Sequence, residues 1–83
     1  MFHKIESVTA LSDLQLSVLF CTGEKKTYDV RHLLEAHDAF KSFSLTHGLF
    51  EQVKVANGGY GIYWNDAIDI SCNELYINGK GTM

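Results

Sequence analysis

Four histidines are the first candidates for chemistry, because neutral imidazole is the commonest metal ligand in proteins. A zinc site on one helix needs two histidines four residues apart, or a cysteine partner at zinc-finger spacing. His32 and His37 are five residues apart, which places them on different faces of a helix. We therefore predict no metal site among the four, which are His3, His32, His37 and His47.

Two further patterns imitate binding loops. Asn65, Asp66 and Asp69 are rich in oxygen, but the alternating ligands and closing glutamate of an EF-hand are missing, so turn formation and helix capping explain them. The segment Gly58-Gly59-Tyr60-Gly61 has the glycines of a phosphate loop. A dinucleotide fingerprint needs a helix after its glycines, whereas strand-like residues follow here. We predict a hairpin at this segment and no cofactor, and we expect Gly61 to allow the close approach of another backbone or side chain.

Cys21 and Cys72 are too few and too far apart for a disulfide framework or a metal knuckle. We expect two free thiols, buried or half-buried. Catalysis by either would need a histidine, a third orienting group and an activating environment. The sequence carries no such constellation, and we predict that the protein is not an enzyme.

Composition predicts one small packed domain over residues 1–83. The chain has 83 residues, of which 46% are hydrophobic and 20% are charged, and its net charge is −3. Its one basic cluster, Lys25-Lys26, is too small to neutralise nucleic-acid phosphates. The N-terminus lacks a signal-peptide pattern, and no apolar run reaches the roughly 20 residues of a membrane span. We expect a cytoplasmic protein that binds neither nucleic acid nor membrane.

The stretch from Val53 to Trp64 organises the predicted fold. Two alternating segments flank Asn57-Gly58-Gly59, which suits a two-residue hairpin turn centred on either Asn57-Gly58 or Gly58-Gly59. Both registers give the same two faces, because they have the same parity. The predicted buried face holds Val53, Val55, Ile62 and Trp64, and the predicted solvent-facing or partner-facing side holds Gln52, Lys54, Gly61 and Tyr63.

Alternation in the N-terminal half predicts a three-stranded antiparallel meander. The first strand spans residues 4–10 with an irregularity near Ser7, and a turn follows at residues 11–14. A loop at Thr22-Gly23-Glu24 then returns the chain. This loop places Lys26, Tyr28 and Val30 opposite Phe20, Val18 and Leu16, respectively.

Two short helices separate the meander from the hairpin, and a third closes the chain. Asp29 and Asp38 are the predicted caps of the first two. Their buried sides hold Leu33 and Leu34, and then Ala39, Phe40 and Phe43, with Leu49 and Phe50 packing against the hairpin. A short extended piece holds Ile68 and Ile70. Ser71 and Glu74 have capping-box spacing for a last helix over residues 72–78, ending at a C′ glycine, Gly79. The predicted class is α+β.

The order of these residues resembles the bacterial domain-of-unknown-function family 2442. The most specific part of the resemblance is the segment from Gly58 through Trp64. The other matching residues are Leu16, Val18 and Phe20; Gly23-Glu24; Tyr28-Asp29-Val30; Leu33-Leu34; Phe40 and Phe43; Phe50, Val53 and Val55; Asp69-Ile70-Ser71; and Leu75-Tyr76 before Gly79. The resemblance implies a small α+β domain, often encoded beside a second small protein as a toxin–antitoxin pair and sometimes fused to a helix-turn-helix. Since the sequence stops at Met83, we expect no such appendage.

These observations favour a non-enzymatic protein-interaction module, antitoxin-like, that masks a small co-encoded partner. The alternative is a small-ligand-binding or regulatory domain with a pocket between the helices and the hairpin, near Tyr60 and Trp64. Homodimerisation through a free sheet edge stays open. The candidate contact residues are Lys54, Tyr60, Tyr63 and Trp64.

Overall fold

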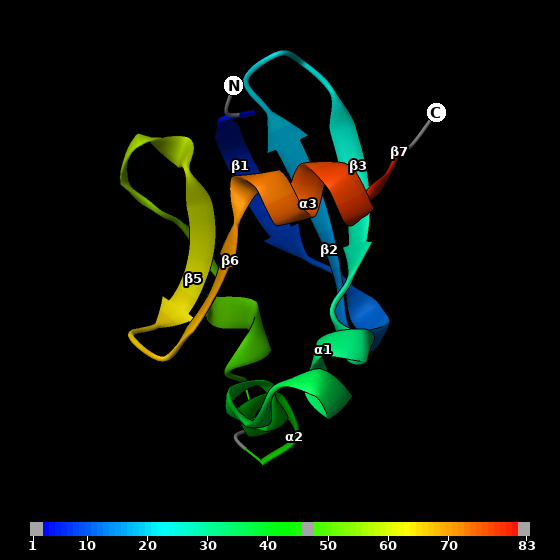
Figure 1. Cartoon of the computed structure of the whole chain (residues 1–83), viewed down its shortest axis with the longest axis vertical. Helices are drawn as coiled ribbons and strands as arrows, with labels where there is room; N and C mark the ends of the chain where they lie inside the picture. The colour runs from blue at the N-terminus through cyan, green and yellow to red at the C-terminus, as the bar shows by residue number, and fades with distance from the viewer. Residues whose placement is uncertain (1–2, 46–47, 82–83) are drawn as a thin grey trace.

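Seven short strands form two antiparallel sheets in the computed structural model, which describes residues 3–45 and 48–81 (Figure 1). His47, one of the four histidines considered as metal ligands, lies outside the described residues. The first sheet has the order β1-β2-β3-β7, with β1 at Ile5–Ala10, β2 at Gln15–Phe20, β3 at Lys25–Asp29 and β7 at Lys80–Gly81. The second has the order β4-β5-β6, with β4 at Lys54–Val55, β5 at Gly61–Asn65 and β6 at Ile68–Ser71.

Short helices connect and cover the sheets, which confirms the α+β class. The α-helices are α1 at Arg31–Ala36, α2 at Ser42–Leu45 and α3 at Cys72–Asn78. Single 3₁₀ turns occupy Ser12–Leu14, Asp38–Lys41, Phe50–Gln52 and Asn57–Gly59. In Figure 1, α3 crosses in front of the first sheet, and α1 and α2 lie at one end.

The meander forms as predicted, but its second hairpin has a different register. Leu16 pairs with Tyr28, and Val18 pairs with Lys26, two residues away from the predicted pairing. The cause is Gly23, whose φ of +96° suits the last position of a three-residue loop that starts at Cys21. A shift of two residues keeps every side chain on its predicted face, so the core is unchanged.

One edge of the first sheet has the predicted irregularity, and the other edge has a strand that was not predicted. The pairing of β1 with β2 shifts register between Ile5 and Ser7, at the predicted irregularity. At the other edge β7 adds a fourth strand to the predicted three, pairing Lys26 with Gly81 and Thr27 with Lys80. Two residues that include a glycine carry no alternation, so the sequence gives no signal for β7.

The central hairpin is confirmed, although its turn is not a two-residue turn. Val55 pairs with Ile62, the register expected for a turn centred on Gly58-Gly59. The amide of Ala56 donates to the carbonyl of Gly61, which closes a four-residue loop over positions 57–60. Gly58 and Gly59 both adopt positive φ, near +80°, which explains why glycines occupy the loop.

The two faces of the hairpin are largely as predicted. Ile62 and Trp64 are buried, whereas Lys54 and Tyr63 are exposed. Val53 and Val55 are only half-buried, and Gln52 is exposed but belongs to the preceding 3₁₀ turn. Gly61 is buried rather than solvent-facing. The expected close approach at this glycine is confirmed, because a Cβ there would lie 2.7 Å from the carbonyl oxygen of Ile70 in β6.

Helix termini show which capping predictions hold. Helix α3 has the predicted bounds, and the Ser71 hydroxyl accepts a hydrogen bond from the amide of Glu74. Asp29 accepts from the amide of Arg31 at the start of α1, and hydrogen bonds from the Arg31 side chain lower the pKa of Asp29 to about 2. Asp38 makes no cap hydrogen bond; it is exposed and pairs with Lys41 instead.

Gly79 ends α3 for a different reason from the one predicted. Its φ is −75°, so it does not adopt the left-handed conformation of a C′ glycine. A Cβ at this position would collide with the carbonyl of Leu75 and press against the Lys26 side chain. Glycine is therefore needed here for close packing of α3 against β3.

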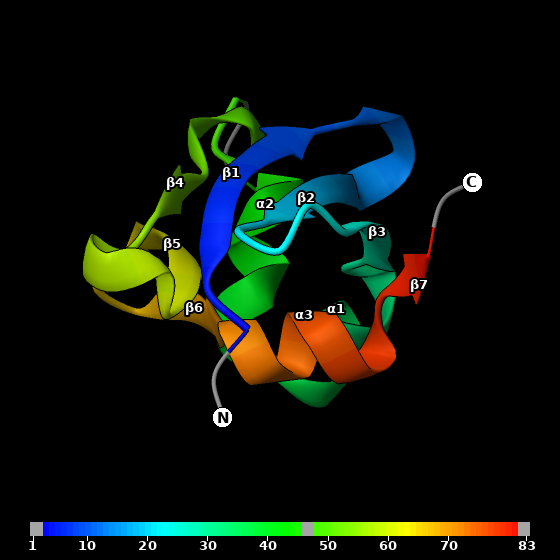
Figure 2. The same cartoon turned by 90° about the horizontal axis from the view of Figure 1, so that it is seen from above.

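One continuous core joins both sheets to α3. Leu16, Val18 and Tyr28 enter it from the first sheet, Ile62 from the second and Leu75 from α3, each at most 1% exposed. Figure 2 shows β1 between the second sheet and the rest of the first, with α3 across one side. An aromatic cluster at the helical end extends this core and consists of Phe40, Phe43, Phe50 and Trp64.

Replacing Gly61 by alanine tests the contact between β5 and β6. The new methyl group would push against the Ile70 carbonyl, and we expect Gly61→Ala to lower the free energy of unfolding by about 1–3 kcal/mol. Urea unfolding followed by Trp64 fluorescence measures this loss. Gly81→Ala is the matched control, because a Cβ at Gly81 meets nothing within 4 Å. Equal midpoints for the two variants would contradict the close approach.

Candidate functional site

The outer face of the second sheet carries a row of polar and aromatic side chains. Strand pairing places Lys54 of β4 beside Tyr63 of β5, and Tyr63 beside Asp69 of β6. All three side chains are on exposed residues. The row follows from the two-residue period of the strands, since their neighbours Ile62 and Ile70 point to the core.

A hollow of about 300 Å³ lies next to this row, over Gly61. Tyr60 and Tyr63 line it and remain 47% and 37% exposed. The ammonium group of Lys4 lies 5.4 Å from the centre of the Tyr60 ring, within the range of a cation–π contact. The structure thus brings three of the predicted contact residues, Lys54, Tyr60 and Tyr63, to one surface.

Trp64 is the predicted contact residue that does not join them. It is 6% exposed, and its indole Nε1 donates a 2.8 Å hydrogen bond to the carbonyl of Phe50. Its ring packs edge-to-face against Phe43, with centroids 4.8 Å apart. Trp64 therefore serves the core, and the hollow beside Tyr60 does not extend to it.

A larger groove lies between β6, α1 and α3. It has a volume of about 610 Å³ and combines apolar, carboxylate and imidazole side chains. Strand β6 separates it from the hollow, because Asp69, Ile70 and Ser71 line both. The residues around the groove are His32, Leu33, His37, Phe40, Asp69, Ile70, Ser71, Glu74 and Asn78.

Sequence reasoning missed this groove. Its residues come from four separate segments, so no local motif marks it. The sequence pattern indicates turn formation and helix capping for Asp69, and a capping box for Ser71 and Glu74. Only half of that box forms: the Ser71 hydroxyl accepts from the Glu74 amide, but the Glu74 carboxylate does not accept from the Ser71 amide. The Glu74 side chain instead points towards Tyr28 and Asn78, and the sequence gives no signal for this direction.

Glu74 instead belongs to a hydrogen-bond network at the back of the groove. The buried Tyr28 hydroxyl donates to Glu74 Oε2 at 2.8 Å and lies 3.2 Å from Nε2 of His32. Asn78 Nδ2 donates to the same oxygen at 2.9 Å. Burial, reinforced by the nearby carboxylate, raises the pKa of Tyr28 well above its usual value of 10.0. The network ties β3 to α3 and keeps the phenol protonated.

The structure also shows where the asparagine of the β5–β6 turn and the two cysteines lie. Asn65 Oδ1 accepts from the amides of Ala67 and Ile68, which is the predicted turn chemistry. Both cysteines are free, but Cys21 is exposed, contrary to the prediction, because it lies in the β2–β3 loop; Cys72 is buried. Within residues 3–45 and 48–81, no three potential metal-ligating side chains cluster.

Fold and surface together define a small α+β domain with two antiparallel sheets, one of which carries two partly exposed tyrosines beside a hollow on its outer face. Residues 5–81 match the family described as protein of unknown function (DUF2442), and the chain belongs to this family. No curated protein and no solved structure matches it. None of the described helices is long and apolar enough to cross a membrane.

Removing the Tyr28 hydroxyl tests the network. We expect Tyr28→Phe to cost about 1–2 kcal/mol of stability at neutral pH, because it deprives Glu74 of a buried donor. The folded-state pKa of Tyr28 is raised, so its contribution is complete below about pH 10, the unfolded value, and declines as pH rises above it. Wild-type stability should then fall by up to about 1.4 kcal/mol per pH unit from this group, and Tyr28→Phe should lack that loss.

Urea unfolding at several pH values between 7 and about 11 measures both effects. Tyr63→Phe is the control at neutral pH, because it removes an exposed hydroxyl and should change stability by less than about 0.5 kcal/mol. If Tyr28→Phe, like the control, has the stability and the pH dependence of the wild type, the Tyr28 hydroxyl does not hold β3 to α3.

Proposed function

We propose that this protein is a non-enzymatic protein-interaction module that binds a partner through the outer face of its second sheet. The observation that carries the proposal is the pair of partly exposed tyrosines, Tyr60 and Tyr63, that line the hollow over Gly61. Tyrosine is enriched in binding hot spots because its ring gives a large contact area at low entropic cost. The hollow can receive one side chain of a partner.

Neighbouring charges favour this face as a recognition surface. Lys54 and Asp69 lie on opposite sides of Tyr63, so an aromatic anchor is bordered by one cation and one anion. Rim charges of this kind select partners and set the rate of association more than they add affinity. Both lie in paired strands of a sheet whose inner face is buried, so the surface is held in shape before binding.

We propose that the partner is a small co-encoded protein and that this module masks it, in the manner of an antitoxin. The family resemblance supports this idea, and a net charge of −3 suits a basic partner. A bacterial, cytoplasmic setting is part of the same proposal. Catalysis is left out because the described network that most resembles an active site, Tyr28 with His32 and Glu74, has a buried phenol whose raised pKa opposes its ionisation.

A second candidate is the binding of a small ligand in the hollow beside Tyr60. The volume of about 300 Å³ favours it, since this is the lower end of the range for small-molecule sites. Its distinguishing result would be a metabolite that raises the melting temperature of the wild type but not that of Tyr60→Ala.

Affinity capture from the native lysate tests the interaction proposal. We expect tagged wild-type protein to retain one stoichiometric small basic protein at low salt and to lose it at high salt. In the purified pair, Tyr63→Ala should weaken binding about tenfold or more, because tyrosine hot spots are worth about 2 kcal/mol. Calorimetric titration measures that change.

Ile77→Ala is the matched control, because Ile77 is 66% exposed on α3, outside the tyrosine face. It should bind with wild-type affinity. A lysate that yields no partner, or a partner that binds Tyr63→Ala as tightly as wild type, would refute the proposed surface. A partner-free preparation that sediments as a dimer would assign the face to self-association.

A further inference from the structure

The groove between β6, α1 and α3 is lined by both apolar and polar side chains. Leu33, Phe40 and Ile70 supply apolar surface, and Asp69 and Glu74 supply carboxylates. A volume of about 610 Å³ is large enough for several side chains of a bound segment. This combination suits a ligand that is partly apolar and partly charged.

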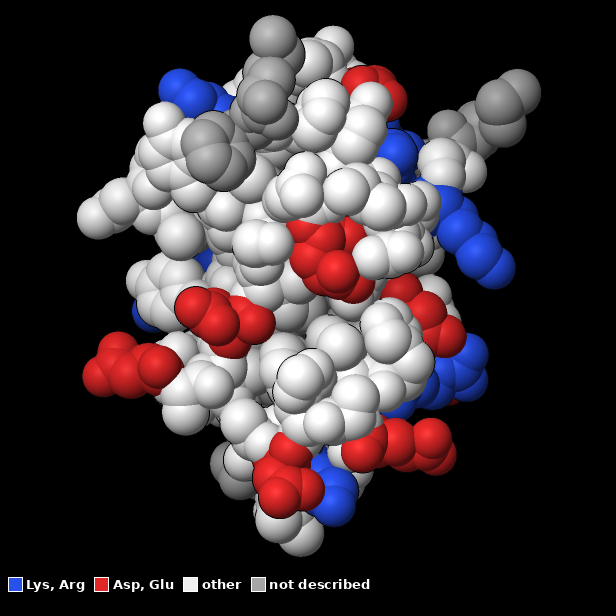
Figure 3. Space-filling model, viewed as in Figure 1, with Lys and Arg blue, Asp and Glu red and all other residues white. Residues whose placement is uncertain are grey.

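Carboxylates outnumber permanently cationic side chains in the groove. Asp69 and Glu74 line it together with two imidazoles, those of His32 and His37, and its lining contains neither lysine nor arginine. Arg31 and Lys41, from the neighbouring helical segments, are engaged by Asp29 and Asp38 at 2.8 and 3.1 Å. Figure 3, in the same view as Figure 1, shows Asp and Glu side chains spread over the face of β6, α3 and α1, with Lys and Arg towards its margins. The groove therefore complements a cation.

The Glu74 carboxylate is held in place for such a ligand. Tyr28 and Asn78 both donate to its Oε2 atom, and no described side chain donates to Oε1. Asp69 forms no ion pair with any described residue. Two carboxylates, one of them fixed by a buried tyrosine, thus have acceptor oxygens available to an incoming group.

The shape of the ligand follows from β6. In the order β4-β5-β6 this strand pairs on one side only among the described residues, so its other edge offers unpaired backbone groups. Three consecutive β6 residues line the groove. An extended segment can add to such an edge, with alternate side chains entering the groove.

We infer that this groove docks an extended, arginine-bearing segment of a protein partner. Arginine fits better than lysine, because its planar guanidinium can form paired hydrogen bonds to a carboxylate. The site shares Asp69 of β6 with the tyrosine face, whereas Glu74 belongs to the groove alone and Tyr63 to the tyrosine face alone. Variants of Glu74 and Tyr63 therefore test this inference separately from the function proposed above.

The probe is a capped five-residue peptide with arginines at its second and fourth positions, separated by valine and flanked by threonines. We expect it to shift the backbone amide resonances of Asp69, Ser71 and Glu74 in the full-length protein. A peptide with lysines should bind more weakly, and one with glutamines should not bind measurably. Binding should weaken as salt is raised.

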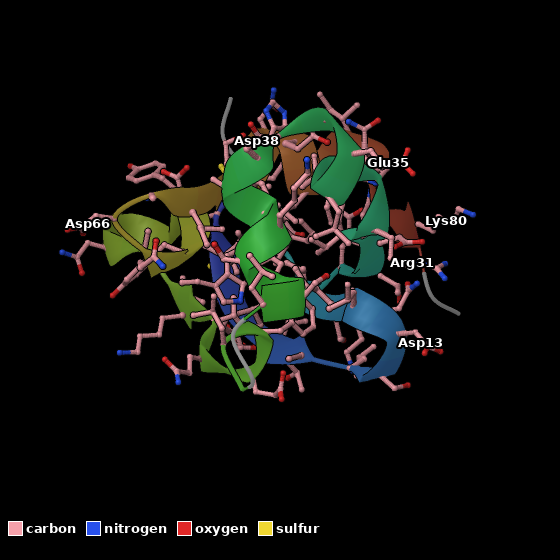
Figure 4. All side chains as sticks on the ribbon, turned by 90° about the horizontal axis from the view of Figure 1, so that it is seen from below. Asp13, Arg31, Glu35, Asp38, Asp66 and Lys80 are labelled. Carbon is pink, nitrogen blue, oxygen red and sulfur yellow. The ribbon has the colours of Figure 1, made fainter. Side chains whose placement is uncertain are left out.

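Charge-removing variants locate the site. Asp69→Asn and Glu74→Gln should each weaken binding of the arginine peptide about tenfold, the usual effect of losing a charged hydrogen bond. The control is Asp66→Asn, which removes the same charge from the β5–β6 turn, outside the groove (Figure 4). It should change the dissociation constant by less than about twofold.

Two results would overturn the inference. One is equal binding of the arginine and glutamine peptides; the other is an equal effect of Asp66→Asn and Asp69→Asn, which would mean attraction by net charge alone. Asp69 is exposed, so its variant remains informative even if Glu74→Gln disturbs the Tyr28 network. Tyr63→Ala should still bind the peptide, which separates this test from that of the tyrosine face.

Discussion

Burial of two small sheets against one another and against α3 is the interaction on which the whole structure depends. Sheets of this size are marginal when isolated, because one open face remains in water. Here α3 joins them: the Cys72 amide donates to the carbonyl of Tyr60 in the hairpin loop, and the Lys26 ammonium of β3 donates to the carbonyl of Tyr76. A chain of this length is stable by only about 4–12 kcal/mol, so a contact worth 2 kcal/mol is a large share of the total.

The candidate surfaces are consequences of this arrangement. Strand alternation directs Ile62 and Trp64 to the shared core and therefore Tyr63 to the outside. Gly61, which has no side chain, lines a hollow together with Tyr60 and Tyr63. The groove is lined by residues of β6, α1 and α3, and its Glu74 carboxylate is held by Tyr28. One edge strand thus positions both surfaces.

Local patterns predicted the parts of the fold that depend on local physics. The period-two runs identified the buried faces of β2 and β5, and the Ser71–Glu74 spacing identified the start of α3. Features that need distant partners were missed or misassigned. The register at Gly23 depends on loop geometry, and the β7 edge strand depends on a neighbour that is remote in sequence. Trp64 was a predicted contact residue because aromatic side chains suit both cores and interfaces, and its bond to Phe50 shows which role applies.

Native-state hydrogen exchange tests most directly whether the outer sheet face is held rigid by the shared core. The amides to compare are those of Cys72, bonded to Tyr60 at the second sheet, and Val30, bonded to Leu14 at the first. If one core supports both sheets, the two amides should exchange through the same global opening, with equal free energies and equal sensitivity to denaturant. Exchange of Cys72 at a free energy several kcal/mol below that of Val30 would contradict this, because the second sheet would then open alone.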